Sequence, residues 1–99
     1  MDLKKTQKEV YQNKVDKGFN ITNVEEEFCQ IYGEVAEAFE AYRKKQDDVG
    51  EELADVTIYI LGLAEILGVD LADEIEKKIQ KNKNREYKTI NGVNTRVKD

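Results

Sequence analysis

Residues 33–56, "GEVAEAFEAYRKKQDDVGEELADV", decide how this chain folds. They contain two helix-like stretches, each with a pair of acidic residues three positions apart: Glu34 with Glu37, and Glu52 with Asp55. Residues i and i+3 share one helix face, with Cβ atoms about 5–6 Å apart, so each pair sets two carboxylates side by side. The second pair leads into an almost unbroken apolar run. Carboxylates therefore stand where a hydrophobic core is expected.

Apolar residues recur at helical spacing in four segments of the chain, separated by residues that begin or end helices. We expect helices over residues 2–17, 24–45, 49–67 and 71–87. Asn23 and Asp48 are expected to cap the second and third helices, and Gly18 and Gly68 to end the first and third. After residue 87, an Asn-Gly pair between β-prone residues predicts a small hairpin or an ordered arm. The fold class is all-α, a four-helix bundle.

The packing faces of the second and third helices predict self-association. The second helix has one stripe that we expect to be buried, formed by Val24, Phe28, Ile31, Val35, Phe39 and Tyr42. Ala38 and Ala41 lie on the flank of the acidic pair, where small side chains let a backbone or a ligand come close. Residues 53–67 are apolar on every side, and a helix of that kind is buried all round. Three short helices cannot enclose it, so we expect a homo-oligomer built around this helix.

Composition narrows the class of protein. Ninety-nine residues make a single domain, 1–99, and the net charge of −5 argues against nucleic acid held on a broad basic surface. No apolar run reaches about 18 residues, so no membrane span is expected. Cys29 is the only cysteine, which excludes a disulfide within the chain. A lone thiol, with no signal-peptide pattern, predicts a cytoplasmic protein.

The four carboxylates favour a metal site. The alternative is a solvated acidic face, and for Glu34 and Glu37 alone that interpretation would be preferred. Asp55, however, lies in the run that must be buried, and Lys and Arg are absent between Lys45 and Lys77. A desolvated carboxylate then needs either a proton or a bound cation. The chain has no histidine, so the metal must be one that prefers oxygen ligands, such as Mg²⁺, Mn²⁺ or Ca²⁺.

A basic face follows on the last predicted helix. Lys78, Asn82 and Arg85 stand at positions i, i+4 and i+7, in line with the apolar residues Leu71 and Ile75. Solvation is the usual fate of charged residues on a final helix. Alignment with an apolar stripe favours an inward or interfacial position instead. A metal together with these three side chains would suit a polyphosphate.

The ordered set of motifs resembles the MazG-like nucleotide pyrophosphohydrolases. E-x-x-E, about fifteen residues, E-x-x-D and then K-x-x-x-N-x-x-R cover residues 24–87, leaving 88–99 as a C-terminal tail. The resemblance implies an all-α bundle that forms dimers or dimers of dimers. It also implies an Mg²⁺-dependent enzyme that cleaves a nucleoside triphosphate to monophosphate and pyrophosphate, in nucleotide-pool housecleaning. The family often shows E-E-x-x-E, whereas Gly33 stands at the first acidic position here; we expect activity to survive this change.

The resemblance also implies roles for individual residues. The metal ligands would be Glu34, Glu37, Glu52 and Asp55, with Mg²⁺ as the cofactor and Mn²⁺ as a substitute. Lys78, Asn82 and Arg85 would bind the substrate phosphates, including across a dimer interface. Without histidine, a carboxylate must accept the proton of the attacking water, and we expect Glu34 or Glu37 in that role.

Several alternatives remain open from the sequence. Tyr11, Phe19, Tyr32 and Tyr59 could stack on a nucleobase, although core packing is the more frequent role of such residues. Phosphoribosyl-ATP pyrophosphohydrolase and dUTPase-like enzymes are related alternatives that share the metal site and differ in substrate. A different class is a non-catalytic helical oligomer that binds divalent metal for stability.

Overall fold

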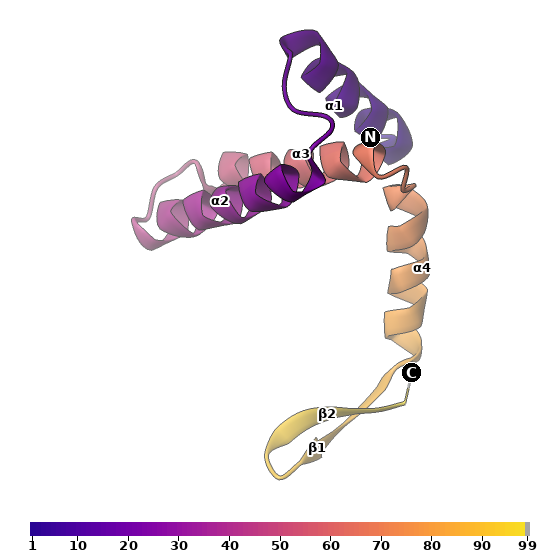
Figure 1. Cartoon of the computed structure of the whole chain (residues 1–99). Helices are drawn as coiled ribbons and strands as arrows, with labels where there is room; N and C mark the ends of the chain where they lie inside the picture. The colour runs from indigo at the N-terminus through magenta and orange to yellow at the C-terminus, as the bar shows by residue number, and fades with distance from the viewer. Residues whose placement is uncertain (99) are drawn as a thin grey trace.

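The computed structural model describes residues 1–98 and consists of four helices followed by a β-hairpin (Figure 1). The elements are α1 (Leu3–Lys17), α2 (Val24–Arg43), α3 (Val49–Ile66), α4 (Leu71–Asn84), β1 (Glu86–Ile90) and β2 (Val93–Lys98). The predicted four helices are confirmed, and so is the hairpin, which turns at Asn91 and Gly92 with both residues at positive φ. The predicted end of the last helix at residue 87 is wrong, because the chain is already extended at Arg85.

Local signals explain most helix ends. The Asn23 side chain accepts a hydrogen bond from the Glu26 N–H at 3.0 Å, as a helix-capping residue should. Gly18 ends α1 at a φ of 70°, which a residue without Cβ adopts freely. Asp48 occupies the predicted N-cap position of α3, but its side chain makes no capping hydrogen bond. α2 ends two residues before position 45, because Lys45 itself takes the left-handed conformation with φ 56°.

The core lies around α3, which packs against α2 on one side and α1 on another (Figure 1). Its buried apolar residues are small or medium in size: Ala38, Ala41, Leu61, Leu63 and Ala64. The two alanines on the acidic flank of α2 therefore allow the close helix approach that was predicted.

The expected burial of the α2 stripe is not found within one chain. Phe28, Val35, Phe39 and Tyr42 are all exposed, Phe39 to 59%. The reason is geometric: α2 turns its alanine and acidic flank toward α3, and the large apolar residues lie on an adjacent flank with no helix against it. On α3 too, Leu53 is 55% exposed, so a single chain does not enclose this helix.

Close contact between α1 and α3 depends on Gly62. A Cβ atom added there would lie 3.1 Å from the Cδ of Lys14 and 3.5 Å from a methyl group of Val10. The first distance is shorter than ordinary van der Waals contact, so the glycine lets the Lys14 side chain cross the surface of α3.

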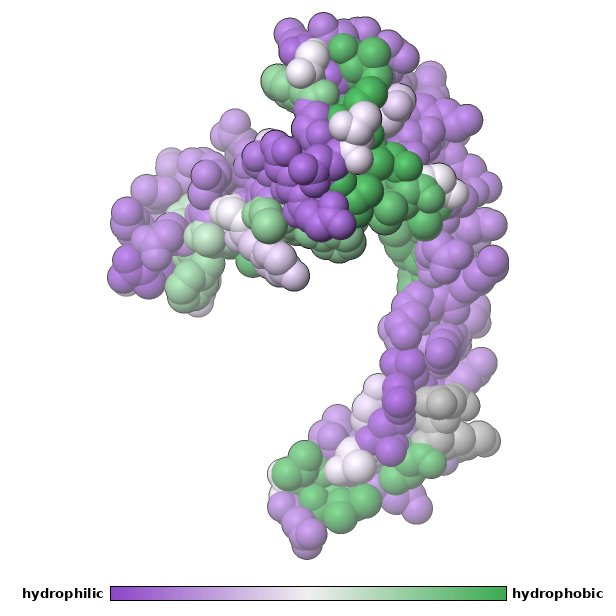
Figure 2. Space-filling view, viewed as in Figure 1, coloured by the Kyte–Doolittle hydropathy of each residue, from purple (hydrophilic) through white to green (hydrophobic). Residues whose placement is uncertain are grey.

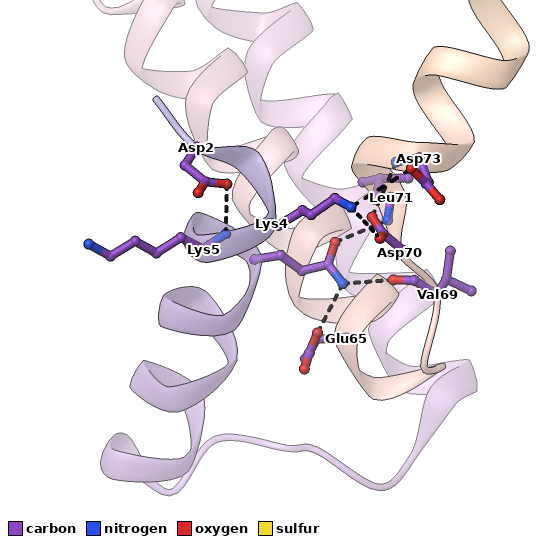
Figure 3. A network of polar contacts seen from close by, with 9 residues as sticks. Asp2, Lys4, Lys5, Glu65, Val69, Asp70, Leu71 and Asp73 are labelled. Atoms are coloured by element: carbon purple, nitrogen blue, oxygen red, sulfur yellow. Dashed lines mark hydrogen bonds and ion pairs between the residues drawn. The ribbon is translucent and has the colours of Figure 1, made fainter.

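A polar network fixes α1 to the turn between α3 and α4. Buried Gln7 donates from Nε2 to the Glu65 carboxylate at 3.0 Å and to the Val69 carbonyl at 2.7 Å, and its Oε1 accepts from the Leu71 N–H at 3.3 Å. Lys4 pairs with Asp70 at 3.1 Å. Figure 3 shows these groups converging on the beginning of α4. The network sets the direction in which α4 leaves the core.

α4 and the hairpin project from the three-helix core, so the chain has the outline of a hook (Figures 1 and 2). The radius of gyration is 16.9 Å, whereas a compact domain of this length has about 13 Å. The bundle of one chain therefore contains α1, α2 and α3, with α4 as an extension. None of the helices in residues 1–98 combines the length and apolar character needed to cross a bilayer.

Candidate functional site

The antiparallel packing of α2 on α3 brings together acidic residues of the two predicted pairs. One carboxylate oxygen from each of Glu34, Glu37 and Glu52 lies within 4.8 Å of the others. Glu37 lies one helical turn after Glu34 on α2, and Glu52 faces both from the first turns of α3. We call Glu34, Glu37 and Glu52 the acidic cluster.

Asp55 lies beside this cluster without belonging to its closest group. Its negative charge is among the causes that raise the pKa of Glu34 and of Glu52. All four predicted acids thus act on one another electrostatically, and three of them are within reach of one ion.

The acidic cluster is electrostatically strained. Partial burial raises the pKa of Glu34 above the usual glutamate value, and the charges of Glu37, Asp55 and Glu52 raise it further. The pKa of Glu52 is raised by partial burial and then by Asp48 and Asp55. Both shifts arise because negative charge is crowded into a poorly hydrated place.

The donor set fits a hard divalent cation. Within residues 1–98, no Lys or Arg forms an ion pair with the acidic cluster. The Oε2 atom of Glu52 and the Oδ1 atom of Asp48 are shielded from solvent and have no hydrogen-bond partner in the described chain. Carboxylate oxygens without partners, held close together, are what Mg²⁺ or Mn²⁺ binds.

These pKa shifts predict how stability depends on pH without divalent cations. The raised pKa values of Glu34 and Glu52 mean that the folded chain holds these protons more tightly than the unfolded chain. Their contribution is complete below the ordinary glutamate pKa of 4.5 and is lost as pH rises through the raised values. In EDTA, we expect the melting temperature to fall as pH rises above about 4.5.

Two other carboxylates have lowered pKa values, so their effect on stability has the opposite dependence on pH and occurs at lower pH. The pKa of Asp70 is lowered by the Asp73 N–H and by Lys4, and that of Glu40 by Arg43. Their stabilisation is lost as pH falls through the lowered values, so melting curves in EDTA should show a maximum at mildly acidic pH. A melting temperature that climbs steadily toward neutral pH in EDTA would contradict the crowding of charge at the cluster.

An open cavity of about 540 Å³ lies next to the acidic cluster, between α1, α2 and α3. Phe19, Ile58 and Tyr59 supply apolar surface, and Glu26 and Gln30 line both this cavity and the smaller hollow that contains Glu34 and Glu37. Its volume is in the range of small-molecule sites. The cavity and the hollow that contains Glu34 and Glu37 are therefore neighbours that share two lining residues.

A buried ion pair forms one wall of this cavity. Lys14 and Glu27 are bonded to each other and are only 8% and 2% exposed. Asn20 donates to the second Glu27 oxygen at 3.1 Å, and the Lys14 ammonium lies 5.6 Å from the centroid of the Tyr59 ring. Burial and the charges of Glu34 and Glu27 raise the pKa of the Tyr59 hydroxyl, which keeps it protonated. The wall is therefore polar, ordered and fully hydrogen-bonded at Glu27.

Lys78, Asn82 and Arg85 are not brought to the acidic cluster within one chain. They lie along α4 and at its C-terminal end, where Arg85 donates to the Asn82 side chain at 3.1 Å. α4 starts from the end of α3 opposite to Glu52 and makes its main contacts with α1 (Figure 1). Lys78 and Asn82 are exposed rather than inward-facing.

The sequence missed the Lys14–Glu27 pair and the contribution of Asp48. A lysine in a polar helix and a glutamate in an acidic first turn both suggest solvated residues. The one available signal was Gly62, a small residue in the apolar α3, which marks a place where another element comes close.

Comparison with known proteins gives one family. The model of the MazG-like family matches residues 17–99. Comparison with curated proteins and with solved structures gives no significant match. The family match covers the acidic cluster, Asp55, the cavity-lining part of α2 and α3, α4 and the hairpin. The chain therefore belongs to the MazG-like family.

Proposed function

We propose that this protein is an Mg²⁺-dependent nucleoside triphosphate pyrophosphohydrolase, releasing pyrophosphate and a (deoxy)nucleoside monophosphate. Membership of the MazG-like family indicates a nucleotide pyrophosphatase type of function. The observation that carries the proposal is the acidic cluster: three carboxylates within 4.8 Å and no cation of the described chain paired with them. Nucleotide-pool housecleaning is the role that such an activity would serve.

Glu34, Glu37, Glu52 and Asp55 would hold the divalent cation, with Mn²⁺ as a substitute for Mg²⁺. When bound, the cation supplies Lewis-acid chemistry, neutralising phosphate charge and acidifying water. One of these carboxylates, Glu34 or Glu37, would accept the proton of the attacking water. As the bond from water oxygen to the α-phosphorus forms, the bond from that phosphorus to the pyrophosphate oxygen breaks.

The rest of the substrate has room in the adjoining cavity. Phe19 and Tyr59 offer apolar surface for a nucleobase, and Gln30 offers an amide between the base and the phosphates. Tyr11 and Tyr32 do not line this cavity, so they are weaker candidates for base stacking. This arrangement favours a nucleotide over a simple polyphosphate as the ligand.

The phosphates would be bound by Lys78, Asn82 and Arg85 of a second copy, because α4 does not approach the acidic cluster of its own chain. The proposal therefore includes a homo-oligomer, either a dimer or a dimer of dimers. The exposed apolar residues of α2 and α3 support self-association.

Activity assays with a substrate panel test this proposal. Ordinary and modified deoxynucleoside triphosphates, dUTP and phosphoribosyl-ATP would each be incubated with Mg²⁺, and pyrophosphate release measured. Release from phosphoribosyl-ATP alone would favour a phosphoribosyl-ATP pyrophosphohydrolase, and release from dUTP alone a dUTPase-like enzyme. No release from any of them, together with Mg²⁺ binding, would favour the non-catalytic metal-binding oligomer.

Metal binding is expected to raise thermal stability whether or not a nucleotide is hydrolysed. A ligand at 100 times its dissociation constant stabilises the folded state by about 2.7 kcal/mol. For a domain of this size, that raises the melting temperature by about 10–20 °C. Scanning calorimetry with and without Mn²⁺ at neutral pH would measure the shift.

The control for this shift uses two glutamates one turn apart on α2. Glu37→Gln should remove most of the Mn²⁺-induced shift, whereas Glu40→Gln should keep it, because Glu40 is already paired with Arg43 at 2.9 Å. Equal shifts in the two variants would mean that Mn²⁺ binds elsewhere.

A further inference from the structure

One face of α2 carries three polar residues at equal spacing: Gln30, Glu37 and Lys44. Residues seven positions apart lie on the same helix face, two turns and about 10 Å along the axis from each other. Gln30 lines the large cavity between α1, α2 and α3, and Glu37 belongs to the acidic cluster. The face therefore leads from the large cavity, past the carboxylates, to a positive charge.

Lys44 lines a hollow on the side of the acidic cluster that faces away from the large cavity. This hollow has a volume of about 340 Å³, and Glu37, Glu52 and Gln46 also line it. Glu37 is shared with the hollow that contains Glu34, which adjoins the large cavity. We call the space beside Lys44 the Lys44 hollow. The acidic cluster thus lies between the large cavity and the Lys44 hollow.

The turn after α2 fixes the backbone around Lys44. Lys45 has the left-handed φ of 56°, and its N–H donates to the Tyr42 carbonyl at 3.0 Å. The Gln46 N–H donates to the Ala41 carbonyl at 2.9 Å. These two bonds form a Schellman motif, which closes the end of a helix. Lys44 and Gln46 are therefore presented to the hollow by an ordered, hydrogen-bonded turn.

The Lys44 ammonium has hydrogen-bond donors left for a ligand. Among the described residues that line the hollow, Lys44 is the single cation. It lies 3.8 Å from Glu40, a carboxylate that Arg43 already binds at 2.9 Å. An ammonium has three donors, and one distant carboxylate does not occupy them. The hollow thus has a positive group that points to an anionic ligand.

An anion can enter the Lys44 hollow only together with a divalent cation. Glu37 and Glu52 also line it, and their negative charges repel an anion while they are not neutralised. A cation bound by the acidic cluster inverts this local field. Lys44 then adds a second positive charge on the same side.

The large cavity has the opposite electrostatic character. Its charged lining residues are Glu9, Lys14, Glu26 and Glu27, three carboxylates and one ammonium, with a net charge of −2. Phosphates are disfavoured there, whereas a nucleobase can contact its apolar surface. The basic residues of α4 are distant from both spaces in the same chain, because α4 begins at the other end of α3 (Figure 1).

We propose that the Lys44 hollow binds the terminal phosphates of the substrate, the group released as pyrophosphate, and that Lys44 is their ligand from the same chain. The identity of this ligand rests on the proposed function. The nucleotide lies along α2, with its base in the large cavity, its α-phosphate beside the acidic cluster and its β- and γ-phosphates at Lys44. Lys44 donates a charge-assisted hydrogen bond to a phosphate oxygen, and the Gln46 amide lies beside it.

Lys44 is an addition to the phosphate ligands proposed on α4 of a second copy. It lies between the E-x-x-E and E-x-x-D motifs and belongs to neither of them. Because it is in the same chain as the acidic cluster, its contribution does not depend on the arrangement of the copies.

Calorimetric titration of the full chain with inorganic pyrophosphate tests the assignment without turnover. At a fixed concentration of free Mg²⁺, Lys44→Gln should raise the dissociation constant of pyrophosphate about tenfold, the effect of losing one charge-assisted hydrogen bond. Lys45→Gln removes the same charge one residue later, outside the lining of the hollow, and should change the constant by less than about twofold. Lys44→Arg should keep most of the affinity, since a guanidinium also binds phosphate.

The second product provides a further control. Binding of a deoxynucleoside monophosphate should be equal in the parent and in Lys44→Gln, because the hollow is assigned to the terminal phosphates alone. Equal weakening of both products in Lys44→Gln would overturn the proposal. So would a parent that binds no pyrophosphate in Mg²⁺, one that binds it equally well in EDTA, or a Lys44→Gln protein that binds it like the parent.

The same variants separate this inference from the proposed function. Pyrophosphate binding that depends on Lys44, in a protein that hydrolyses no nucleotide, would support the Lys44 hollow and contradict the hydrolase. Hydrolysis with the same KM in the parent and in Lys44→Gln would contradict the assignment of Lys44 alone.

Discussion

Glu52→Gln is expected to reduce pyrophosphate release from deoxynucleoside triphosphates at least about 1,000-fold, the scale expected when a catalytic cation is lost. The Oε2 atom of Glu52 is shielded from solvent and has no hydrogen-bond partner in residues 1–98, so it is positioned to bind a cation. Glutamine has nearly the same shape, but its uncharged amide presents a single oxygen and a nitrogen that repels a metal. Initial rates with saturating Mg²⁺ would measure the loss.

The neighbouring residue gives a matched control. Glu51 is exposed on another face of the same helical turn, and it acts on the cluster only through its charge. Glu51→Gln should keep the parent rate within about threefold, since an exposed charge near the site is screened by salt. Comparable losses in the two variants would show that the rate depends on the total negative charge near the site and not on a metal ligand at position 52.

Folding of the Glu52→Gln protein can be checked independently. Because the substitution removes one of several crowded negative charges, the variant should melt at a higher temperature than the parent in EDTA. An inactive variant with raised stability cannot owe its inactivity to unfolding. If it melts below the parent in EDTA, the charge crowding described for the cluster is wrong.

Asp55 influences the acidic cluster without belonging to its closest group of carboxylates. It raises the pKa of Glu34 and Glu52 but is not in the group whose oxygens lie within 4.8 Å. Asp55 would join the ligands if its side chain turned toward the cluster when a cation binds. The structural alternative, a metal bound for stability alone, would keep the Mn²⁺-induced rise in melting temperature and release no pyrophosphate.

Local features of the fold could be predicted from the sequence, because they depend on neighbours a few residues apart. The Asn23 cap, the glycine that ends α1 and the Asn-Gly hairpin turn are of this kind. The two acid pairs could be assigned to one site because a short loop forces α2 and α3 to run antiparallel. Asp48 failed as a cap because its Oδ1 atom is instead buried near Glu52.

Features that depend on distant parts of the chain could not be predicted. Which flank of α2 meets α3 is decided by whole-helix packing, and the alanine flank allows a closer approach than the flank with Phe39 does. The direction of α4 depends on hydrogen bonds of the Gln7 side chain, which accepts from the Leu71 N–H although Gln7 lies 64 residues earlier in the chain. Helical periodicity identifies faces, but it does not say which faces meet.

The largest expected effect on stability is at Glu27, whose side chain is 2% exposed and bonded to Lys14 and Asn20. Glu27→Leu would leave the Lys14 ammonium buried without its counter-ion. Removing one partner of a buried ion pair destabilises a protein by about 3–5 kcal/mol. For a domain of this size, the melting temperature should fall by at least about 12 °C, and calorimetry or circular dichroism would measure it.

Two further variants distinguish the loss of a buried partner from the loss of any ion pair. Glu40→Leu breaks the exposed pair with Arg43 on the same helix and should change the melting temperature little, because water already screens that pair. Lys14→Met combined with Glu27→Leu removes both charges and should recover most of the stability lost in Glu27→Leu, since no buried charge is then left unpaired. If the double variant were as unstable as the single one, shape complementarity rather than charge would hold α1 against α2. The position of Lys14 in the cavity wall would then be due to packing around Gly62.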